Sequence, residues 1–190
     1  MGKIFEFDGR FLISIQELVD KNHWLNQVWI FLAQYLIYGL PILLLVLWFW
    51  SAPTKKAVFK SVVAAVFGWL VFGKALALLV NRPRPEAFAG TQELLFHRPD
   101  TSFPSDHAAL LFALALSMRL HGYKRLGNIM FIIAGIISIT RVFVGVHYPL
   151  DVIVGAIVGC IAAVLFWLID EYLDRYLAVP VLGFLKRFRL

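Results

Sequence analysis

The chain has 190 residues, of which 61% are hydrophobic, and its mean hydropathy is +0.78. A water-soluble core of this size cannot bury so many apolar side chains, so the composition excludes a soluble globular protein and predicts an integral-membrane protein. The net charge of +6 is expected to report membrane topology rather than nucleic-acid binding, because Lys and Arg gather on the cytoplasmic side of membrane proteins.

The N-terminal part of the chain predicts one surface helix and two membrane spans. Residues 11–20 place apolar side chains at near-helical spacing among polar ones, which favours an amphipathic helix at the membrane interface. Residues 24–50 are almost wholly apolar, with Trp near both ends, and predict the first spanning helix. After the short basic connection 51–60, the run from 57 to about 80 predicts the second.

The C-terminal part predicts three more spans. Residues 81–103 form a polar loop that is longer than an ordinary connection and is therefore a candidate for function. The segments 104–120, 126–145 and 149–169 are apolar, and the tail after them interleaves apolar and basic residues as interfacial helices do. We therefore expect an all-α fold in one domain, residues 1–190: a polytopic transmembrane helix bundle with about five spanning helices and interfacial amphipathic N- and C-terminal helices.

The distribution of positive charge predicts the orientation of the bundle. One membrane face receives two connecting loops and the tail, which carry ten basic residues: Lys55, Lys56, Lys60, Arg119, Lys124, Arg125, Arg175, Lys186, Arg187 and Arg189. The other face carries seven, four of them in or near the polar motifs described next: Lys3, Arg10, Lys21, Arg82, Arg84, Arg98 and Arg141. The first face is therefore expected to be cytoplasmic and the second to face outward.

Four polar motifs interrupt the apolar chain at helix ends. "RPRP" follows the second span, "PSDH" opens the third, Arg141 lies near the end of the fourth, and "HYPLD" begins the fifth. Because successive spans alternate in direction, all four motifs meet at the outward face. Polar groups are costly to keep at such places, so the sequence predicts one shared functional pocket.

The residue types in this pocket indicate phosphoryl transfer. Arg84 and Arg141, with the Ser105 hydroxyl and the first-turn N–H groups of the third helix, form an anion site suited to a phosphoryl group. Two histidines, His107 and His147, provide a nucleophile and a proton donor. No cluster resembles a magnesium or zinc site, so we expect no metal and no cofactor, with the arginines stabilising the transition-state charge.

Asp151 stands four residues after His147, next to the helix that Pro149 is expected to begin. If the first turn holds both side chains on one face, the carboxylate can bond one imidazole nitrogen and leave the other as a nucleophile. The alternative is that the two residues only cap the helix. The agreement of four motifs on one membrane face favours the catalytic interpretation.

"RPRP", "PSDH" and "TRVFVGVHYPLD" resemble the three signature motifs of the type 2 phosphatidic acid phosphatase family, in its membrane branch. The resemblance covers residues 74–151 and implies a phosphohistidine mechanism. His147 would be the nucleophile, Asp151 its orienting partner, and His107 the acid that protonates the leaving oxygen. The residues implied to hold the phosphate are Arg84, Ser105 and Arg141.

The chain departs from the family pattern at three positions. Asp106 replaces the glycine of the usual Pro-Ser-Gly-His motif, which is similar to the bacitracin-resistance type of undecaprenyl-diphosphatase. Thr140 replaces a serine and keeps its hydroxyl. Lys74 lies one helical turn before the family's lysine position, counted back from Arg84, but on the same helix face, so its side chain is still expected to reach the phosphate. Arg82 is either a solvated loop charge or, like Asp106 and Thr140, a candidate for tuning substrate choice.

The resemblance implies an integral-membrane lipid phosphatase of the bacterial cytoplasmic membrane, with its site facing the periplasm or cell exterior. The expected reaction is hydrolysis of undecaprenyl diphosphate to undecaprenyl phosphate, which recycles the carrier lipid of wall synthesis and gives bacitracin resistance. One alternative is a phosphatidylglycerophosphate or phosphatidic acid phosphatase with the same mechanism. Another is a small anion transporter. The expected partners are the lipid phosphate and the bilayer, with neither nucleic acid nor an obligate protein partner.

Overall fold

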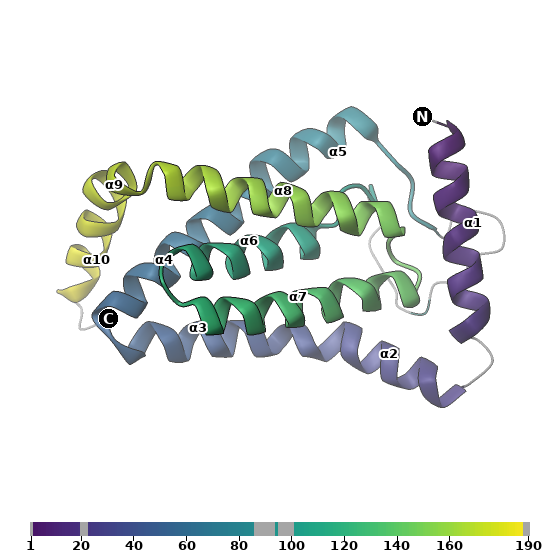
Figure 1. Ribbon diagram of the computed structural model, residues 1–190, viewed down its shortest axis with the longest axis horizontal. Coiled ribbons are helices and arrows are strands. Elements are labelled where there is room, and N and C mark those ends of the chain that lie inside the picture. Colours follow the sequence, from purple (N-terminus) through teal and green to yellow (C-terminus); the bar gives the residue numbers. More distant parts are fainter. Residues whose placement is uncertain (1, 20–22, 86–93, 95–100, 188–190) are drawn as a thin grey trace.

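The computed structural model describes residues 2–19, 23–85, 94 and 101–187. Every regular element in these ranges is helical, so the predicted all-α architecture is confirmed. The longer helices run side by side and form an elongated bundle, with shorter helices across its two ends (Figure 1).

Within the described ranges, four helices are long and apolar enough to cross a membrane. A helix satisfies its own backbone polar groups, which lipid requires of any segment that it surrounds. The first two are composite, because a 3-10 turn interrupts one and a π-helical turn the other. The first, Trp24–Trp50, comprises α2 His23–Tyr35, the turn Leu36–Tyr38 and α3 Gly39–Trp50. The second, Ala52–Val80, comprises α4 Ala52–Phe67, the π turn Gly68–Gly73 and α5 Lys74–Val80, and the others are α7 Lys124–Phe143 and α8 Pro149–Leu168.

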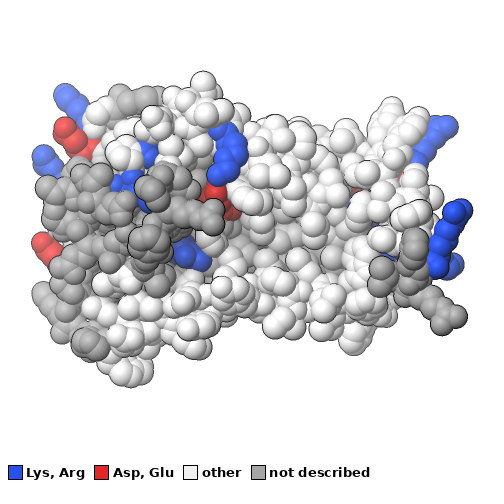
Figure 2. Space-filling view, turned by 180° about the vertical axis from the view of Figure 1, so that it is seen from behind, with Lys and Arg blue, Asp and Glu red and all other residues white. Residues whose placement is uncertain are grey.

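Large apolar side chains cover the outside of the bundle, and small ones fill much of its interior. Leu78, Leu79 and Ile132 are 85%, 80% and 65% exposed, whereas Ala64 and Ala113 are fully buried. Figure 2 shows Lys, Arg, Asp and Glu toward the two ends of the molecule, with an uncharged band between them. Lipid-facing bulk, small interior residues and an uncharged middle are the features of a multi-pass membrane protein.

The helix expected over 104–120 forms as α6, Asp106–Leu120, but it is not a fifth long span. Its 15 residues extend only about 22 Å, less than the roughly 30 Å of a hydrocarbon core. It lies at the centre of the bundle, where it packs against α4, α7 and α8. A helix enclosed by other helices does not need to match the bilayer thickness, because protein rather than lipid surrounds its ends.

Two glycines of α8 let it approach α6 closely. A Cβ atom on Gly159 would lie 2.1 Å from the carbonyl oxygen of Ala109, and one on Gly155 would lie 2.5 Å from that of Ser105. Small residues in such a pattern allow the backbones of membrane helices to touch. The contact brings the N-terminal ends of the two helices together, and the Ser105 N–H donates to the Asp151 carbonyl at 2.9 Å.

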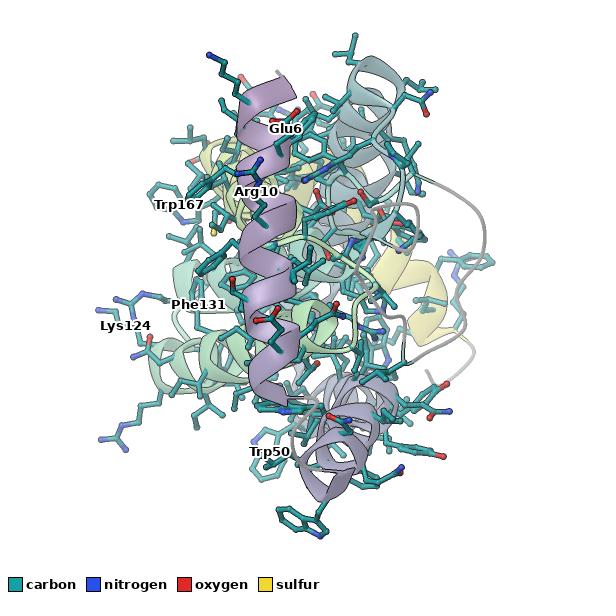
Figure 3. All side chains as sticks on the ribbon, turned by 90° about the vertical axis from the view of Figure 1, so that its right-hand side faces the viewer. Glu6, Arg10, Trp50, Lys124, Phe131 and Trp167 are labelled. Carbon is teal, nitrogen blue, oxygen red and sulfur yellow. The ribbon has the colours of Figure 1, made fainter. Side chains whose placement is uncertain are left out.

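Helices at both termini lie across the bundle ends. The N-terminal helix α1, Gly2–Val19, crosses the end at which α8 begins, as Figure 3 shows with α1 in front. The chain after α8 forms α9 Asp170–Leu173, a π turn Asp174–Ala178 and α10 Val179–Lys186 at the opposite end (Figure 1). These positions are the ones that the predicted interfacial helices require.

A cluster of ion pairs fastens the C-terminal segment to the bundle. Lys60 is buried, and its Nζ lies 2.5 Å from Asp170 and 2.7 Å from Asp174. Burial raises the pKa of Asp170, but hydrogen bonds from Lys60 and His121 outweigh it and leave that pKa below its usual value. Burial also raises the pKa of Asp174, but hydrogen bonds from Lys56 and Lys60 outweigh that effect and leave the pKa below its usual value.

We expect Gly159→Ala to destabilise the protein, because its methyl group would collide with the Ala109 backbone and force α6 and α8 apart. Overpacking of this kind costs about 1–3 kcal/mol. Thermal unfolding in detergent would measure the loss. Gly135→Ala in α7 is the matched control, since a Cβ there meets nothing within 4 Å. Equal melting temperatures for the two variants would contradict the close contact.

We expect acid to weaken the Lys60 cluster. Because the pKa values of Asp170 and Asp174 are lowered on folding, their stabilisation is complete above the ordinary Asp value of 3.8 and is lost as the pH falls through the folded values. Melting temperatures measured between about pH 7 and pH 3 should therefore fall more steeply for the wild type than for Lys60→Met. Lys124→Met, which removes an exposed charge, should keep the wild-type slope. A Lys60→Met slope equal to the wild-type slope would show that the cluster does not contribute.

Candidate active site

The four polar motifs meet at one end of the bundle, as the alternation of spans predicts. This is the end that α1 crosses, where α5 ends, α6 begins, α7 ends and α8 begins (Figures 1 and 3). Hydrogen bonds connect three of the motifs directly: Arg82 Nη1 donates to Asp151 Oδ1 at 2.8 Å, and the Ser105 N–H donates to the Asp151 carbonyl at 2.9 Å. Arg84 Nη1 donates at 2.8 Å to the carbonyl of Val146, the residue before His147.

A tight turn shapes the segment between α7 and α8. The Arg141 carbonyl accepts from the N–H groups of Val146 and His147 at 3.1 and 3.3 Å, and Gly145 supplies the positive φ of 79° that the turn requires. Pro149 then occupies the first helical position, where its missing N–H costs nothing. The turn directs His147 inward, where it is almost completely buried.

His147 is held through its Nδ1 atom, which lies 2.9 Å from the Ser102 carbonyl oxygen. A carbonyl only accepts hydrogen bonds, so Nδ1 carries the proton and Nε2 carries the lone pair of the neutral ring. The predicted direct bond from Asp151 to this imidazole is wrong, because the nearest carboxylate oxygen, Oδ2, lies 3.7 Å from Nδ1. That oxygen instead accepts from the Tyr148 N–H at 3.0 Å and caps its own helix.

Arg82 is buried, so its interpretation as a solvated loop charge is wrong. Its Nη1 atom donates to Asp151 Oδ1 at 2.8 Å and to Asp8 Oδ2 at 2.7 Å. The guanidinium also stacks on the Tyr148 ring, 3.5 Å from the ring centroid. Arg82 is thus a partner of the Asp151 carboxylate, and its contacts offer no support for a role in substrate choice.

Sequence reasoning missed Asp8, which α1 contributes to this cluster. Burial raises its pKa, although the hydrogen bond and the charge of Arg82 oppose that effect. A signal was present, since Asp8 shares a face of α1 with Leu12 and Ile15, both of which pack against the bundle near Tyr148. A carboxylate on the apolar face of an amphipathic helix indicates a buried partner.

Arg84 and Arg141 form the positively charged part of the site. Both are buried, and they lie near enough that their like charges act on each other. Within the described parts of the chain, Arg141 Nε has no hydrogen-bond partner although it is buried. A buried guanidinium nitrogen without a partner is costly, and an anion between the two arginines would satisfy it.

The start of α6 adds backbone donors beside these arginines. Ser105 is the N-cap and is fully buried, and its Oγ accepts from the Ala108 N–H at 3.5 Å. Asp106 and His107 follow in the first turn, both partly exposed. The N-terminus of a helix presents free N–H groups and favours negative charge, so this end of α6 suits a phosphoryl group.

Lys74 pairs with Asp106, the residue that replaces the family's glycine. The Lys74 Nζ atom lies 3.0 Å from Asp106 Oδ2, and the two side chains are 47% and 38% exposed. The lysine therefore lies next to the first turn of α6 but remains open to a ligand. Thr140, in contrast, donates its hydroxyl proton to the Ile137 carbonyl at 2.6 Å within its own helix, which does not support a part in substrate choice.

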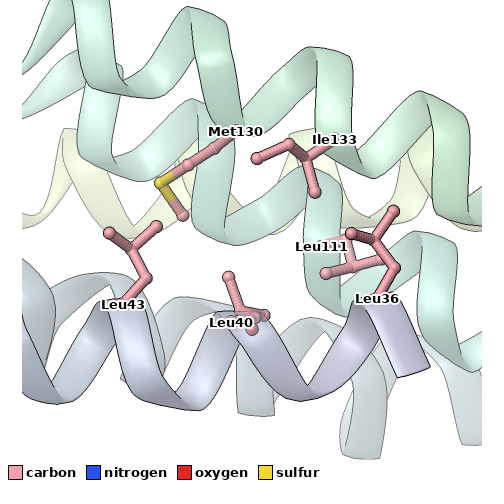
Figure 4. A pocket seen from close by; sticks show the side chains of 7 residues that line it. Leu36, Leu40, Leu43, Leu111, Met130 and Ile133 are labelled. Atoms are coloured by element: carbon pink, nitrogen blue, oxygen red, sulfur yellow. The ribbon is translucent and has the colours of Figure 1, made fainter.

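A separate apolar cavity of about 130 Å³ lies between the first span, α6 and α7. Figure 4 shows Leu36, Leu40 and Leu43 on one side of it and Met130 and Ile133 on the other. Its lining has no ionisable side chain, so it offers nothing that would bind a phosphate. Among the described residues, no three His, Cys, Asp or Glu side chains gather as a metal site.

Arginines, histidines and a helix N-terminus gathered at one end of a membrane bundle define the class of helical membrane phosphatases. Residues 57–175 match the PAP2 superfamily, which covers more than half of the chain. The protein belongs to the PAP2 superfamily and is a membrane lipid phosphatase. The resemblance seen in the three sequence motifs is thereby confirmed.

Individual relatives agree with this assignment. The chain is 30% identical to the putative undecaprenyl-diphosphatase YbjG of Escherichia coli (strain K12), over 78% of this chain and 76% of that protein. It is 34% identical to the bacitracin transport permease protein BcrC of Bacillus licheniformis, over 80% and 76% of the two chains. The crystal structure of Aquifex aeolicus LpxE is similar with a TM-score of 0.65 and 29% identity, over 83% of this chain and 92% of LpxE.

Proposed function

We propose that the protein hydrolyses the terminal phosphate of undecaprenyl diphosphate at the outer face of a bacterial cytoplasmic membrane. The observation that carries this proposal is the ion pair of Lys74 with Asp106, which holds a further cationic group at the first turn of α6. The similarity to the E. coli protein named a putative undecaprenyl-diphosphatase supports the same substrate.

In this proposal His147 is the nucleophile. Its Nε2 lone pair attacks the terminal phosphorus, the bond from phosphorus to the bridging oxygen breaks, and undecaprenyl phosphate leaves with a proton from His107. A water molecule then attacks the phosphohistidine, gives its proton to His107 and releases inorganic phosphate. The Ser102 carbonyl keeps the ring oriented throughout, and Asp151 stabilises the charged imidazole ring through space from 3.7 Å.

Arg84, Arg141, the Ser105 hydroxyl and the first-turn N–H groups of α6 hold the terminal phosphate in this proposal. A diphosphate extends farther than a monophosphate, so its lipid-linked phosphate needs a partner outside this inner site. Lys74 is placed to be that partner, because Asp106 holds its ammonium next to α6 while nearly half of the side chain stays exposed. Asp106 thus acts on substrate choice through the lysine.

A phosphatase of lipid monophosphates and a transporter are the two alternative functions. A phosphatidylglycerophosphate or phosphatidic acid phosphatase would use the inner site equally well but would gain little from Lys74. A transporter function is suggested by the name of the B. licheniformis relative, a transport permease. Binding of an anion alone, however, does not require two histidines beside the arginines.

We expect His147→Ala to lose phosphate release by at least about 10³-fold, because it removes the attacking atom. The measurement is inorganic phosphate released from undecaprenyl diphosphate by purified protein in detergent, with the melting temperature checked in parallel. His121→Gln is the matched control, since His121 lies at the other end of the bundle and bonds Ser117 and Asp170. Substantial release by His147→Ala would exclude the nucleophile role, and no release by the wild type would favour transport.

We expect Lys74→Met to lower kcat/KM about 10–100-fold on undecaprenyl diphosphate and much less on phosphatidic acid, because only the diphosphate reaches the lysine. Lys74→Arg should retain part of the preference, since it keeps the charge. Lys124→Met controls for the loss of an exposed charge. Equal losses on both lipids would refute the selective role of Lys74 and leave the monophosphate alternatives in place.

A further inference from the structure

The N-terminal helix α1 contacts the turn His147–Asp151, called the catalytic turn here, through one buried carboxylate. Asp8 is 7% exposed, and both of its oxygens are used: Oδ2 accepts from Arg82 Nη1 at 2.7 Å, and Oδ1 accepts from the Leu150 N–H at 3.1 Å. The first contact joins Asp8 to Arg82, whose Nη1 atom also bonds Asp151. The second leads to the backbone of α8 three residues after His147.

Among the described residues, α1 and the turn His147–Asp151 provide the side-chain partners of the Arg82 guanidinium. Its Nη1 atom bridges Asp8 and Asp151, and the guanidinium contacts the rings of Tyr148 and Phe5, 3.5 and 4.3 Å from their centroids. Asp8 and Phe5 both come from α1. A guanidinium that contacts two carboxylates and two rings has little freedom, so α1 helps to fix the position of Arg82.

Arg82 in turn supports the groups that hold His147. Its side chain bonds Asp151, and its carbonyl accepts from the N–H of Ser102, the residue whose own carbonyl orients the His147 ring. Asp8 therefore supports the catalytic turn by two routes, through Arg82 and through Leu150. The route through Arg82 ends at Asp151 Oδ2 and the Ser102 carbonyl oxygen, 3.7 and 2.9 Å from His147 Nδ1.

We infer that Asp8 is a positioning residue of the active site, supplied by a helix outside the segment that matches the PAP2 superfamily. The matched segment begins at residue 57, so α1 lies outside it. Asp8 does not touch the reacting atoms. It fixes the turn from His147 to Asp151 so that the nucleophile stays oriented toward the phosphate. The position of α1 thereby affects the reaction rate. The inference rests on the proposed phosphatase reaction for its kinetic readout only.

The test compares Asp8→Asn with Glu6→Gln, which removes an exposed negative charge from the same helix. Asparagine keeps an acceptor for the Leu150 N–H but loses the charge that holds Arg82. We expect Asp8→Asn to lower kcat about tenfold or more, with KM changed less than about threefold and an unchanged melting temperature, whereas Glu6→Gln matches the wild type. Asp8→Glu should recover part of the rate, because it restores the charge.

Hydrogen–deuterium exchange of peptides covering residues 147–151 gives a readout that does not depend on activity. We expect Asp8→Asn to exchange there several-fold faster than Glu6→Gln, with the rest of the bundle unchanged. If the wild type releases no phosphate, the proposed function fails while the exchange data still decide the role of Asp8. An Asp8→Asn variant that matches Glu6→Gln in both readouts, or that loosens the whole bundle, overturns the inference. Should Asp8→Asn not fold, Phe5→Leu removes only the ring over Arg82, and unchanged exchange at 147–151 in that variant also overturns it.

Discussion

The close contact between α6 and α8 is the constraint on which the site depends. Gly155 and Gly159 allow the α8 backbone to touch the carbonyls of α6, where any side chain would collide. Van der Waals packing of small residues is the main source of helix association where lipid replaces water, so this contact both holds the bundle together and sets its register. One result is that the first turns of two helices, with His107 in one and Asp151 in the other, start side by side at the same membrane face.

The bundle end that α1 crosses holds, among the described residues, two buried carboxylates and three buried arginines: Asp8, Asp151, Arg82, Arg84 and Arg141. Arg82 bonds Asp8 and Asp151, and the second oxygen of Asp151 takes the Tyr148 N–H. Arg82 has two carboxylate partners, so its buried charge keeps one of them when the other is lost. Nearby, Arg141 keeps a buried nitrogen without a partner among the described residues. In the proposed reaction, these donors would already be in position when the phosphoryl group binds, which is the basis of electrostatic catalysis.

Sequence reasoning succeeded where local composition decides the outcome. Apolar length predicted the long helices, and the alternation of their directions brought the four motifs together, because both follow from bilayer thickness. It failed on α6, since an apolar run enclosed by protein looks the same as one enclosed by lipid. It also failed on Arg82 and on the partner of His147, because a carbonyl of Ser102 and a carboxylate of α1 reach these groups from distant parts of the chain. No spacing rule connects residue 8 with residue 82, although the carboxylate on the apolar face of α1 was a usable signal.

The sequence by itself determined that this is a helical membrane protein whose arginine and histidine motifs meet at one end of the bundle. Those properties depend on side-chain polarity and on helix direction, which are local or are imposed by the bilayer. The tertiary structure decided which arginine bonds Asp151, which group orients His147, and which residue pairs with the shifted Lys74. The π turn Gly68–Gly73 directly before Lys74 shows why, since such a turn changes the direction in which every later side chain of the helix points. Its effect on the site appears only when the π turn packs against α6 and the Lys74 ammonium meets Asp106.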